Sequence, residues 1–256
     1  MLEQIRPDSG ENNLPGAWRL RGPLNEMALQ SALSDFIRIH PMLRARFFQD
    51  NSRVTRRENP LASIPLLQGC DFSSTPAGQR ETEFQKWLED MARVPFDLSN
   101  EPPIRMYLAR LGPEEHAIYA VSHSIAWDGW CFDIMLEDLG LLYSAHCRRE
   151  EPQLPQSTIR YEDFAYWQRT RGQSDRGQED LLFWQKRLAG ALKTLPIPTD
   201  RPRPQNPNHA GARSNFALND HLVTQLSKLA RERGRHRLYD LVVHLVGSYR
   251  SDDRPK

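Results

Sequence analysis

The segment AIYAVSHSIAWDGW, residues 117–130, determines the fold that we expect for this chain. Its first five residues, Ala117 to Val121, form an apolar run that predicts a buried strand. A helical pattern of apolar residues leaves the segment at Trp130 and continues to about His146. The residues in between are therefore predicted to form a strand-to-helix turn, where polar side chains can project into a cleft.

Similar patterns extend from this segment in both directions. Further strands are expected at residues 17–21, 43–48, 53–56, 104–111 and 212–218, and two pairs of strands predict hairpins. Helices are expected from the N-cap Asn25 to Pro41, at residues 77–92, 130–146, 161–169 and 180–189, and after a cap at Asn219 or Asp220. Because hairpins occur beside crossovers, the predicted fold class is α+β, a mixed sheet flanked by helices.

Apolar residues recur at helical spacing along one face of each of the first three expected helices. These faces are predicted to be core, and they comprise Leu29, Leu33, Phe36 and Ile37, then Phe84, Trp87, Leu88 and Met91, then Phe132, Met135, Leu136, Leu139, Leu142 and Tyr143. Tyr161, Phe164 and Trp167 form a similar stripe in the fourth helix, and we interpret them as packing residues as well.

The composition excludes several classes of partner. The chain has 256 residues, a net charge of +1 and 39% apolar residues, a balance that favours neither nucleic acid nor acidic lipid. Its three cysteines have no metal-binding spacing, and a sparse, odd number of cysteines is typical of the cytoplasm. Neither a signal peptide nor a membrane span is expected, because no apolar run is long enough.

The polar residues of the expected turn carry the chemistry. His123 could act as a general base if its ring reached the proton of a nucleophile. Asp128 could orient the histidine or hold the loop through an ion pair, and Gly129 would give the turn a freedom that a Cβ forbids. Such an arrangement activates an amine or hydroxyl for attack on a thioester or ester.

Several motifs in order give the chain a strong resemblance to a known family. Residues 123–131 read HSIAWDGWC, where the condensation domains of nonribosomal peptide synthetases carry His-His-x-x-x-Asp-Gly, often continued by Trp-Ser. Other elements similar to those of the family are LPGAWRLRGPL at 14–24, HPMLRARF at 40–47, PFDL at 95–98, YEDFAYWQ at 161–168, FWQKRLAG at 183–190 and TDRPRP at 199–204. The resemblance covers about residues 14 to 230.

The resemblance implies a chloramphenicol acetyltransferase-like fold of two lobes with the active site between them. We expect a disordered N-terminus at 1–13, a condensation-like N-terminal lobe at 14–190, a proline-rich linker at 191–209 and a truncated start of the C-terminal lobe at 210–256. The later strands of the second lobe are not recognisable, so an apolar lobe interface is expected to be exposed and to promote self-association.

The resemblance also implies a reaction, in which an acceptor amine attacks a donor acyl thioester and an amide forms. Carrier proteins of neighbouring synthetase modules would present both substrates on phosphopantetheine, so neither a tightly bound cofactor nor a metal is expected. Ser124 stands where the family has its second histidine, the proposed base or transition-state orienter. A serine hydroxyl is not a base near neutral pH, so activity is doubtful.

Alternatives to simple impairment of the site remain open from the residues alone. His123 could replace the lost base, although neighbouring residues of a strand point to opposite faces of the sheet. Ser124 could instead be a nucleophile with His123 as its base, although adjacent residues rarely meet in that geometry. If positioning supplies most of the rate, loss of the base would slow the reaction without abolishing it.

Three further residues of the motif receive individual expectations. By resemblance, Asp128 fixes the loop through an arginine in the second lobe. Trp130 is expected to pack beneath the loop, and both Trp127 and Trp130 are candidate substrate contacts.

Two rival functions remain, a catalytically silent domain that docks carrier proteins or modules, and an acyltransferase acting on a free alcohol or amine.

Overall fold

A computed structural model describes residues 10–50, 53–60, 67–152, 159–191, 202 and 217–232 of the chain. The chain divides into two compact units, Met1–Arg187 and Leu188–Lys256. The first unit contains the strands and every described helix except α7 (Asp220–Glu232), which belongs to the second unit. The motif therefore lies entirely within the first unit.

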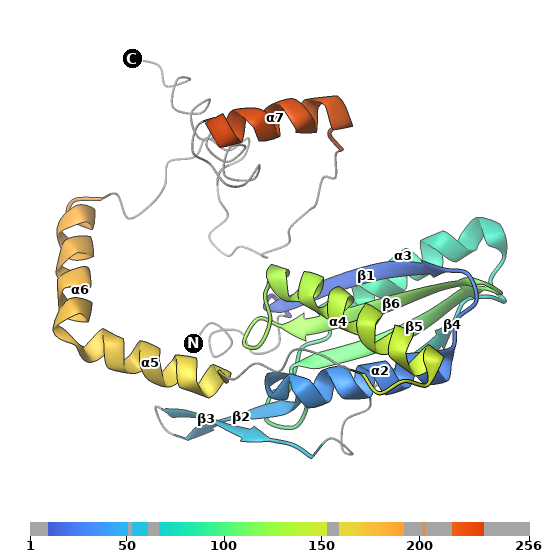
Figure 1. The fold of residues 1–256 in the computed structure, drawn as a ribbon, viewed down its shortest axis with the longest axis horizontal. Helices are drawn as coiled ribbons and strands as arrows, with labels where there is room; N and C mark the ends of the chain where they lie inside the picture. The colour runs from blue at the N-terminus through green and yellow to red at the C-terminus, as the bar shows by residue number, and fades with distance from the viewer. Residues whose placement is uncertain are drawn as a thin grey trace. The chain divides into compact units, whose positions relative to one another are not determined.

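A four-stranded mixed sheet forms the centre of the first unit, as predicted (Figure 1). Its strands lie in the order β1 (Asn13–Arg21), β6 (Glu115–His123), β5 (Ile104–Gly112) and β4 (Gln68–Asp71). β6 pairs antiparallel with both β1 and β5, whereas the edge strand β4, which was not predicted, runs parallel to β5. The motif strand β6 is thus central in the sheet.

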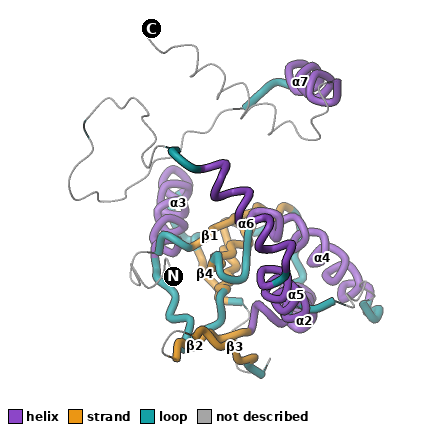
Figure 2. The backbone as a smooth tube through the Cα atoms, turned by 90° about the vertical axis from the view of Figure 1, so that its left-hand side faces the viewer, coloured by secondary structure: helices purple, strands orange, loops and turns teal. Residues whose placement is uncertain are grey.

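Helices cover both faces of this sheet (Figure 2). The helices α2 (Glu26–Ile39) and α4 (Gly129–Arg148) lie on one face, and α3 (Ala77–Arg93) lies on the other. Because both faces are covered, β6 is buried from His116 to His123, and its residues alternate between two cores. Ile118 and Ala120 face α2 and α4, whereas the odd-numbered residues from Ala117 to Val121 face α3.

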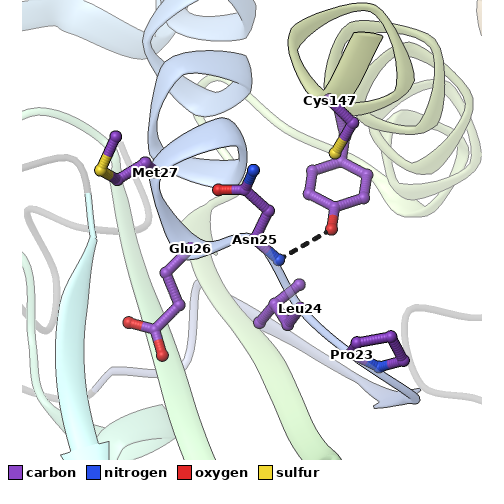
Figure 3. Close-up of a pocket in the computed structure, with 7 residues that line it drawn as sticks. Pro23, Leu24, Asn25, Glu26, Met27 and Cys147 are labelled. Atoms are coloured by element: carbon purple, nitrogen blue, oxygen red, sulfur yellow. Dashed lines mark hydrogen bonds between the residues drawn. The ribbon is translucent and has the colours of Figure 1, made fainter.

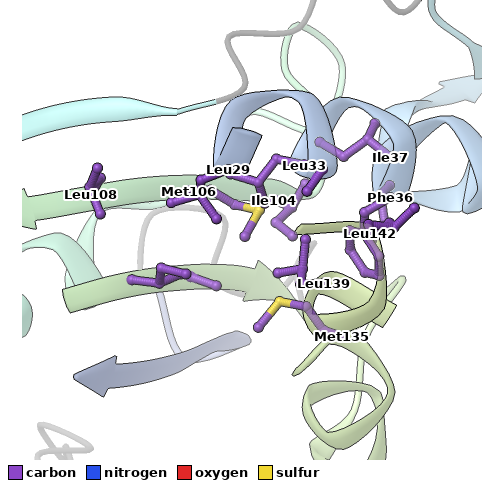
Figure 4. Packing of buried hydrophobic residues seen from close by; sticks show 14 of the residues in the cluster. Leu29, Leu33, Phe36, Ile37, Ile104, Met106, Leu108, Met135, Leu139 and Leu142 are labelled. Carbon is purple, nitrogen blue, oxygen red and sulfur yellow. The ribbon is translucent and has the colours of Figure 1, made fainter. Parts of the chain in front are cut away.

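Side chains of α2 and α4 interlock over the sheet to form the larger core (Figure 4). The predicted cap of α2 is confirmed, since Asn25 accepts a hydrogen bond from the Ala28 N–H at 3.0 Å. The predicted stripe of α2 is buried, and from α4 the core takes Met135, Leu139 and Leu142. Leu136 was expected in this core but is exposed, because it lies away from the sheet on α4.

The opposite core is built on α3 and is rich in aromatic rings. Phe84 is fully buried, and Trp87 packs edge-on against Tyr107 with their ring centroids 5.3 Å apart. The Tyr119 hydroxyl donates to the Leu88 carbonyl at 2.6 Å, and burial raises the pKa of this phenol. The predicted apolar stripe of α3 therefore faces the core, with Phe84 buried in it and Trp87, Leu88 and Met91 partly buried against it.

The predicted first hairpin forms a separate two-stranded sheet. After the short 3₁₀ helix η1 (Pro41–Arg44), β2 (Ala45–Asp50) pairs antiparallel with β3 (Arg53–Glu58). A bond of 2.8 Å from the Phe47 N–H to the Leu98 carbonyl connects this hairpin to the PFDL segment. The hairpin is therefore hydrogen-bonded to residues 95–98, which precede β5.

Helices α5 (Tyr161–Gln173) and α6 (Asp175–Leu188) are longer than predicted and contain no buried residue. The expectation that Tyr161, Phe164 and Trp167 pack into a core is wrong, because all three are about half exposed. Their rings contact one another in sequence along α5, with centroids 5.9 and 5.7 Å apart. The amphipathic pattern correctly predicted the helix α5. Within the described residues, however, no sheet face packs against its apolar side.

The two ends of the chain are only partly described. The N-terminus was expected to be disordered to residue 13, but β1 already begins at Asn13, four residues before the predicted start at Ala17. Residues 1–9, most of the expected linker and most of the strand expected at 212–218 lie outside the described residues. The predicted helix after Asn219 is α7, and the Asn219 side chain caps it by accepting from the Leu222 N–H at 2.8 Å.

Candidate active site at the end of strand β6

The motif forms a tight loop between β6 and α4. The strand ends at His123, residues 124–126 turn, and α4 begins at Gly129. The Ser124 N–H donates to the Asn12 carbonyl at 2.9 Å, and the Ala126 N–H donates to the His123 carbonyl at 3.0 Å. The exposed Ser124 side chain is therefore carried by a backbone that is fixed on both sides.

His123 is buried, with 4% of its surface exposed. Its ring nitrogen Nδ1 accepts a hydrogen bond from the Ile125 N–H at 3.0 Å. A backbone N–H can only donate, so the lone pair of Nδ1 is occupied and the neutral ring carries its proton on Nε2. His123 thus holds the motif loop through the Ile125 N–H, and its ring is buried whereas Ser124 is exposed.

A second layer of residues holds the His123 ring in place. The Phe96 ring, from the PFDL segment, lies nearly perpendicular to the His123 ring, with the two ring centroids 6.0 Å apart. The Arg105 guanidinium lies 3.9 Å from the Phe96 centroid, pairs with Glu101 at 2.7 Å and donates to the Val94 and Pro95 carbonyls.

Asp97 completes this support by bonding the Ser99 hydroxyl and the Asn100 amide, which lower the pKa of its carboxyl. The PFDL segment is therefore held by its own hydrogen bonds and contacts the motif through the Phe96 ring.

Asp128 is the N-cap of α4. Its Oδ1 accepts from the Trp130 N–H at 2.9 Å and the Cys131 N–H at 3.1 Å, and the Cys131 thiol lies 3.3 Å away. The thiol and these backbone N–H groups hold the pKa of the Asp128 carboxyl below its usual range. Asp128 therefore has a structural role as the cap of α4, and the arginine pair that the resemblance places in the second lobe stays a prediction.

Gly129 does not have the conformational role that was expected of it. It is the first residue of α4, it has no positive φ, and an added Cβ would meet no atom within 4 Å. The expectation that a Cβ is forbidden here is therefore wrong. Gly129 is exposed and has no side chain, so the backbone next to the cap of α4 is accessible to solvent.

The two tryptophans of the motif have opposite environments. Trp127 is only 6% exposed and packs between Phe36 and Phe132, at centroid distances of 6.5 and 5.3 Å. Trp130, which was expected to pack beneath the loop, is 58% exposed on the first turn of α4. The prediction of core packing is wrong for Trp130, whereas Trp127 is buried; a substrate contact by either tryptophan stays a prediction.

Comparison with known proteins identifies the family and the fold. The sequence profile described as "Condensation domain" matches residues 1–247. The chain belongs to the condensation-domain family. It is 36% identical over 234 residues to a linear gramicidin synthase of Brevibacillus parabrevis, a match that covers 91% of this chain and 4% of that protein. Malpinin synthetase of Mortierella alpina is 30% identical over 233 residues, which are 91% of this chain and 3% of that protein.

Solved structures agree with this assignment. The first condensation domain of the CDA synthetase superposes with a TM-score of 0.72 at 20% identity, over 92% of this chain and 55% of that one. The X-domain in its complex with OxyB from teicoplanin biosynthesis also gives 0.72, at 26% identity, over 90% and 50% of the two chains. The chain thus spans about half of these structures and a small part of the curated synthetases that it matches.

Two pockets of this condensation domain lie at different places along α4. The larger, about 640 Å³, is an open depression where the Tyr143 hydroxyl accepts a bond from the Asn25 N–H at 3.0 Å, with Cys147 beside it (Figure 3). A smaller pocket of about 110 Å³ has Ala126 and Trp127 of the motif loop in its wall. Of these two, only the smaller has motif residues in its lining, so size alone does not locate the site.

Two further properties of the described residues bear on function. No group of three or more His, Cys, Asp or Glu side chains within them is placed to hold a metal ion. In the same part of the chain, every helix is too short or too polar to span a bilayer.

Sequence reasoning missed three residues that hold the motif loop. Asn12 was placed in a disordered terminus, yet its carbonyl fixes Ser124, while Phe96 and Arg105 support His123 from distant segments. The PFDL motif was a usable signal for Phe96. No local pattern pointed to Asn12, because its contact is made by a backbone atom.

Proposed function

We propose that this chain provides the motif-bearing part of a condensation site, in which an acceptor amine attacks a donor acyl thioester. In this reaction the amine nitrogen forms a bond to the thioester carbonyl carbon, the C–S bond breaks, and the phosphopantetheine thiol of the donor carrier leaves with a proton. Family membership over residues 1–247 supports this class of reaction. The loop geometry supports a slow rate.

A single observation supports the slow rate: the imidazole of the motif is turned inward. His123 is buried and its Nδ1 is engaged by the Ile125 N–H, while the exposed position next to it carries only the Ser124 hydroxyl. The other titratable group of the loop, Asp128, has a lowered pKa and is therefore a weak base near neutral pH. Positioning of the two substrates would have to supply the remaining acceleration.

A silent docking function is the second candidate, and one comparison favours it. The X-domain that superposes on this chain was solved as a complex with another protein, OxyB. A condensation-type fold can therefore serve as a binding surface. The half-exposed apolar side chains of α5 and α6 would suit such a role or self-association.

Membership of the condensation-domain family also supports a proposal for the partners and the compartment of either function. We propose that the partners are carrier proteins and neighbouring synthetase modules, which present substrates on phosphopantetheine, and that the chain acts in the cytoplasm. All three cysteines are unpaired, which supports a reducing compartment.

A single-turnover transfer assay separates the two candidates. The chain is mixed with an acyl-loaded donor carrier and an aminoacyl-loaded acceptor carrier, and the amide product is measured by mass spectrometry. Slow product formation by the parent chain, raised about 10²- to 10⁴-fold in Ser124→His, is the expected result. The matched control, Ser124→Ala, should leave the parent rate unchanged, since the hydroxyl is no base.

Carrier binding without any product, in both the parent and Ser124→His, would overturn the condensation proposal in favour of docking. Activity lost in Ser124→Ala but retained in the parent would instead assign a direct role to the serine hydroxyl.

A further inference from the structure

One side of α6 carries a row of large apolar side chains that no described residue buries. Leu181, Trp184 and Leu188 recur at helical spacing, and they are 50%, 56% and 58% exposed. The row begins at Leu181, because one turn earlier a Cβ on Gly177 would clash with the Arg171 carbonyl oxygen of α5. A helix of 14 residues is only marginally stable in water unless another surface packs against it. A partner surface that covers the row would therefore stabilise α6.

Two charges of opposite sign flank this row on one side. Asp180 and Arg187 are about two helical turns apart, so they lie on the same side of α6, each just before a residue of the row. The other side carries the uncharged Gln178 and Gln185. Asp180 pairs with Arg171 of α5 at 3.2 Å, but both side chains are about half exposed, so this pair contributes little. Arg187 is exposed and has no acidic partner in the part of the chain that the structure describes.

We propose that the row on α6 binds the same row of a second copy of this chain, with the two helices antiparallel. A two-fold axis at Trp184 places Leu181 against Leu188 of the second copy. The same axis places Asp180 beside Arg187 of the second copy, and each contact occurs twice because the interface is isologous. In a parallel pair Asp180 would instead lie beside the side with the two glutamines. The charges therefore favour the antiparallel dimer, since flanking charges set the orientation of paired helices.

This complementarity of the α6 row with itself is what identifies the occupant as a second copy. The proposal goes beyond the proposed function and does not depend on it, because the dimer needs neither a carrier protein nor the motif loop. The first measurement is sedimentation velocity on the full chain without carriers, over a range of protein concentrations. A reversible dimer with a Kd of about 10–100 μM is expected, because two short helices bury less surface than a standard interface.

Charge reversal tests the orientation of the two helices. Asp180→Arg makes the charged side of the row entirely basic, and Arg187→Asp makes it entirely acidic. Each variant alone should dimerise about tenfold more weakly than the parent, because two exposed ion pairs are replaced by repulsion. An equal mixture of the two variants should form a heterodimer about as tight as the parent dimer, since every aspartate then lies beside an arginine. The variant that carries both changes should dimerise like the parent for the same reason.

A matched pair of apolar substitutions tests the position of the interface. Trp184→Ser removes the residue at the centre of the row and should abolish dimerisation. Leu182→Ser is the control, because Leu182 is 64% exposed on the same helix but lies off the row. Its Kd should equal that of the parent. Both positions are exposed, and circular dichroism checks that each variant has the helix content of the parent.

Three outcomes would overturn the proposal. The first is a parent chain that stays monomeric at every concentration, including one whose α6 row binds only an added carrier protein. The second is a mixture of the two charge variants that associates no better than either variant alone. The third is a dimer that persists in folded Trp184→Ser or is lost equally in Leu182→Ser. Amide formation is measured separately, so failure here is distinguishable from failure of the proposed function.

Discussion

The motif segment 117–130 and the helical segment 161–188 are both rich in large apolar side chains, but the fold uses them differently. β6 is buried along nearly its whole length, and the loop after it is held by Asn12, Phe96 and Asp128. α5 and α6 contain no buried residue in the described structure, although they carry more aromatic rings. The comparison shows that the spacing of apolar residues determines whether a segment is a helix or a strand. Burial of those residues requires another element of the fold to pack against them.

The largest contrast between these regions should appear in the free energy of unfolding. Leu33→Ala removes a fully buried side chain from the core under the motif and is expected to cost about 2–5 kcal/mol. Leu182→Ala, the matched change on exposed α6, should stay within about 0.5 kcal/mol. Urea denaturation followed by circular dichroism measures both. Similar losses for the two variants would show that α6 is buried in solution.

The cap of α4 should give the next largest effect. Asp128→Ala is expected to cost about 0.5–2 kcal/mol of stability, whereas Asp128→Asn retains a good N-cap and should cost less. The folded pKa of Asp128 is lowered, so its ionised form stabilises the fold above about pH 4, and this contribution is lost as the pH falls through the folded pKa.

Thermal unfolding of the chain and of Asp128→Asn across about pH 2–7 tests this sign. The difference between the two should shrink as the pH is lowered. A difference that is constant with pH would mean that the carboxylate does not act as a charged cap.

His123 offers a sharper test of how the loop is held. His123→Phe can still pack against Phe96 but cannot accept from the Ile125 N–H, a loss of about 0.5–1.5 kcal/mol. Hydrogen exchange at the Ile125 amide should accelerate more than exchange at the Ser124 amide, whose acceptor is the Asn12 carbonyl. Equal acceleration at both amides would indicate general loosening of the loop instead.

The smallest effect on monomer stability is expected from Trp167→Glu on α5, yet this change should alter assembly. Trp167 is 52% exposed in a stripe with Phe164 and Tyr161, and a charge there should oppose self-association. Light scattering should give a mass above 29.7 kDa for the parent chain and a lower one for the variant. A monodisperse monomer for the parent would contradict the predicted self-association.

Much of the fold could be predicted, because its signals are local. Asn25 caps α2 as its side chain indicated, the stripe from Leu29 to Ile37 is buried, and β6 and α4 flank the motif as the segment at 117–130 predicted. Leu136 shows the limit, since a helical stripe is wider than the face that packs. The edge strand β4 was missed because four residues carry little periodicity.

The candidate site was predictable in its residues but not in their environments. The motif pointed to His123, Ser124, Asp128 and Gly129 as candidate site residues. It also showed that the second position of the motif holds a serine and not a histidine. The roles of Asp128 and Gly129, however, depended on where α4 begins, which sets the cap and the backbone angles.

The amino-acid order alone determined the family, the strand-to-helix motif and the presence of a serine directly after His123, since each depends on residue identity and short-range periodicity. Only the tertiary structure decided that Trp127 is buried while Trp130 is exposed, and that Phe96 holds His123 inward. The physical reason is that burial and hydrogen-bond partners depend on surfaces brought together from distant parts of the chain, which no local pattern records.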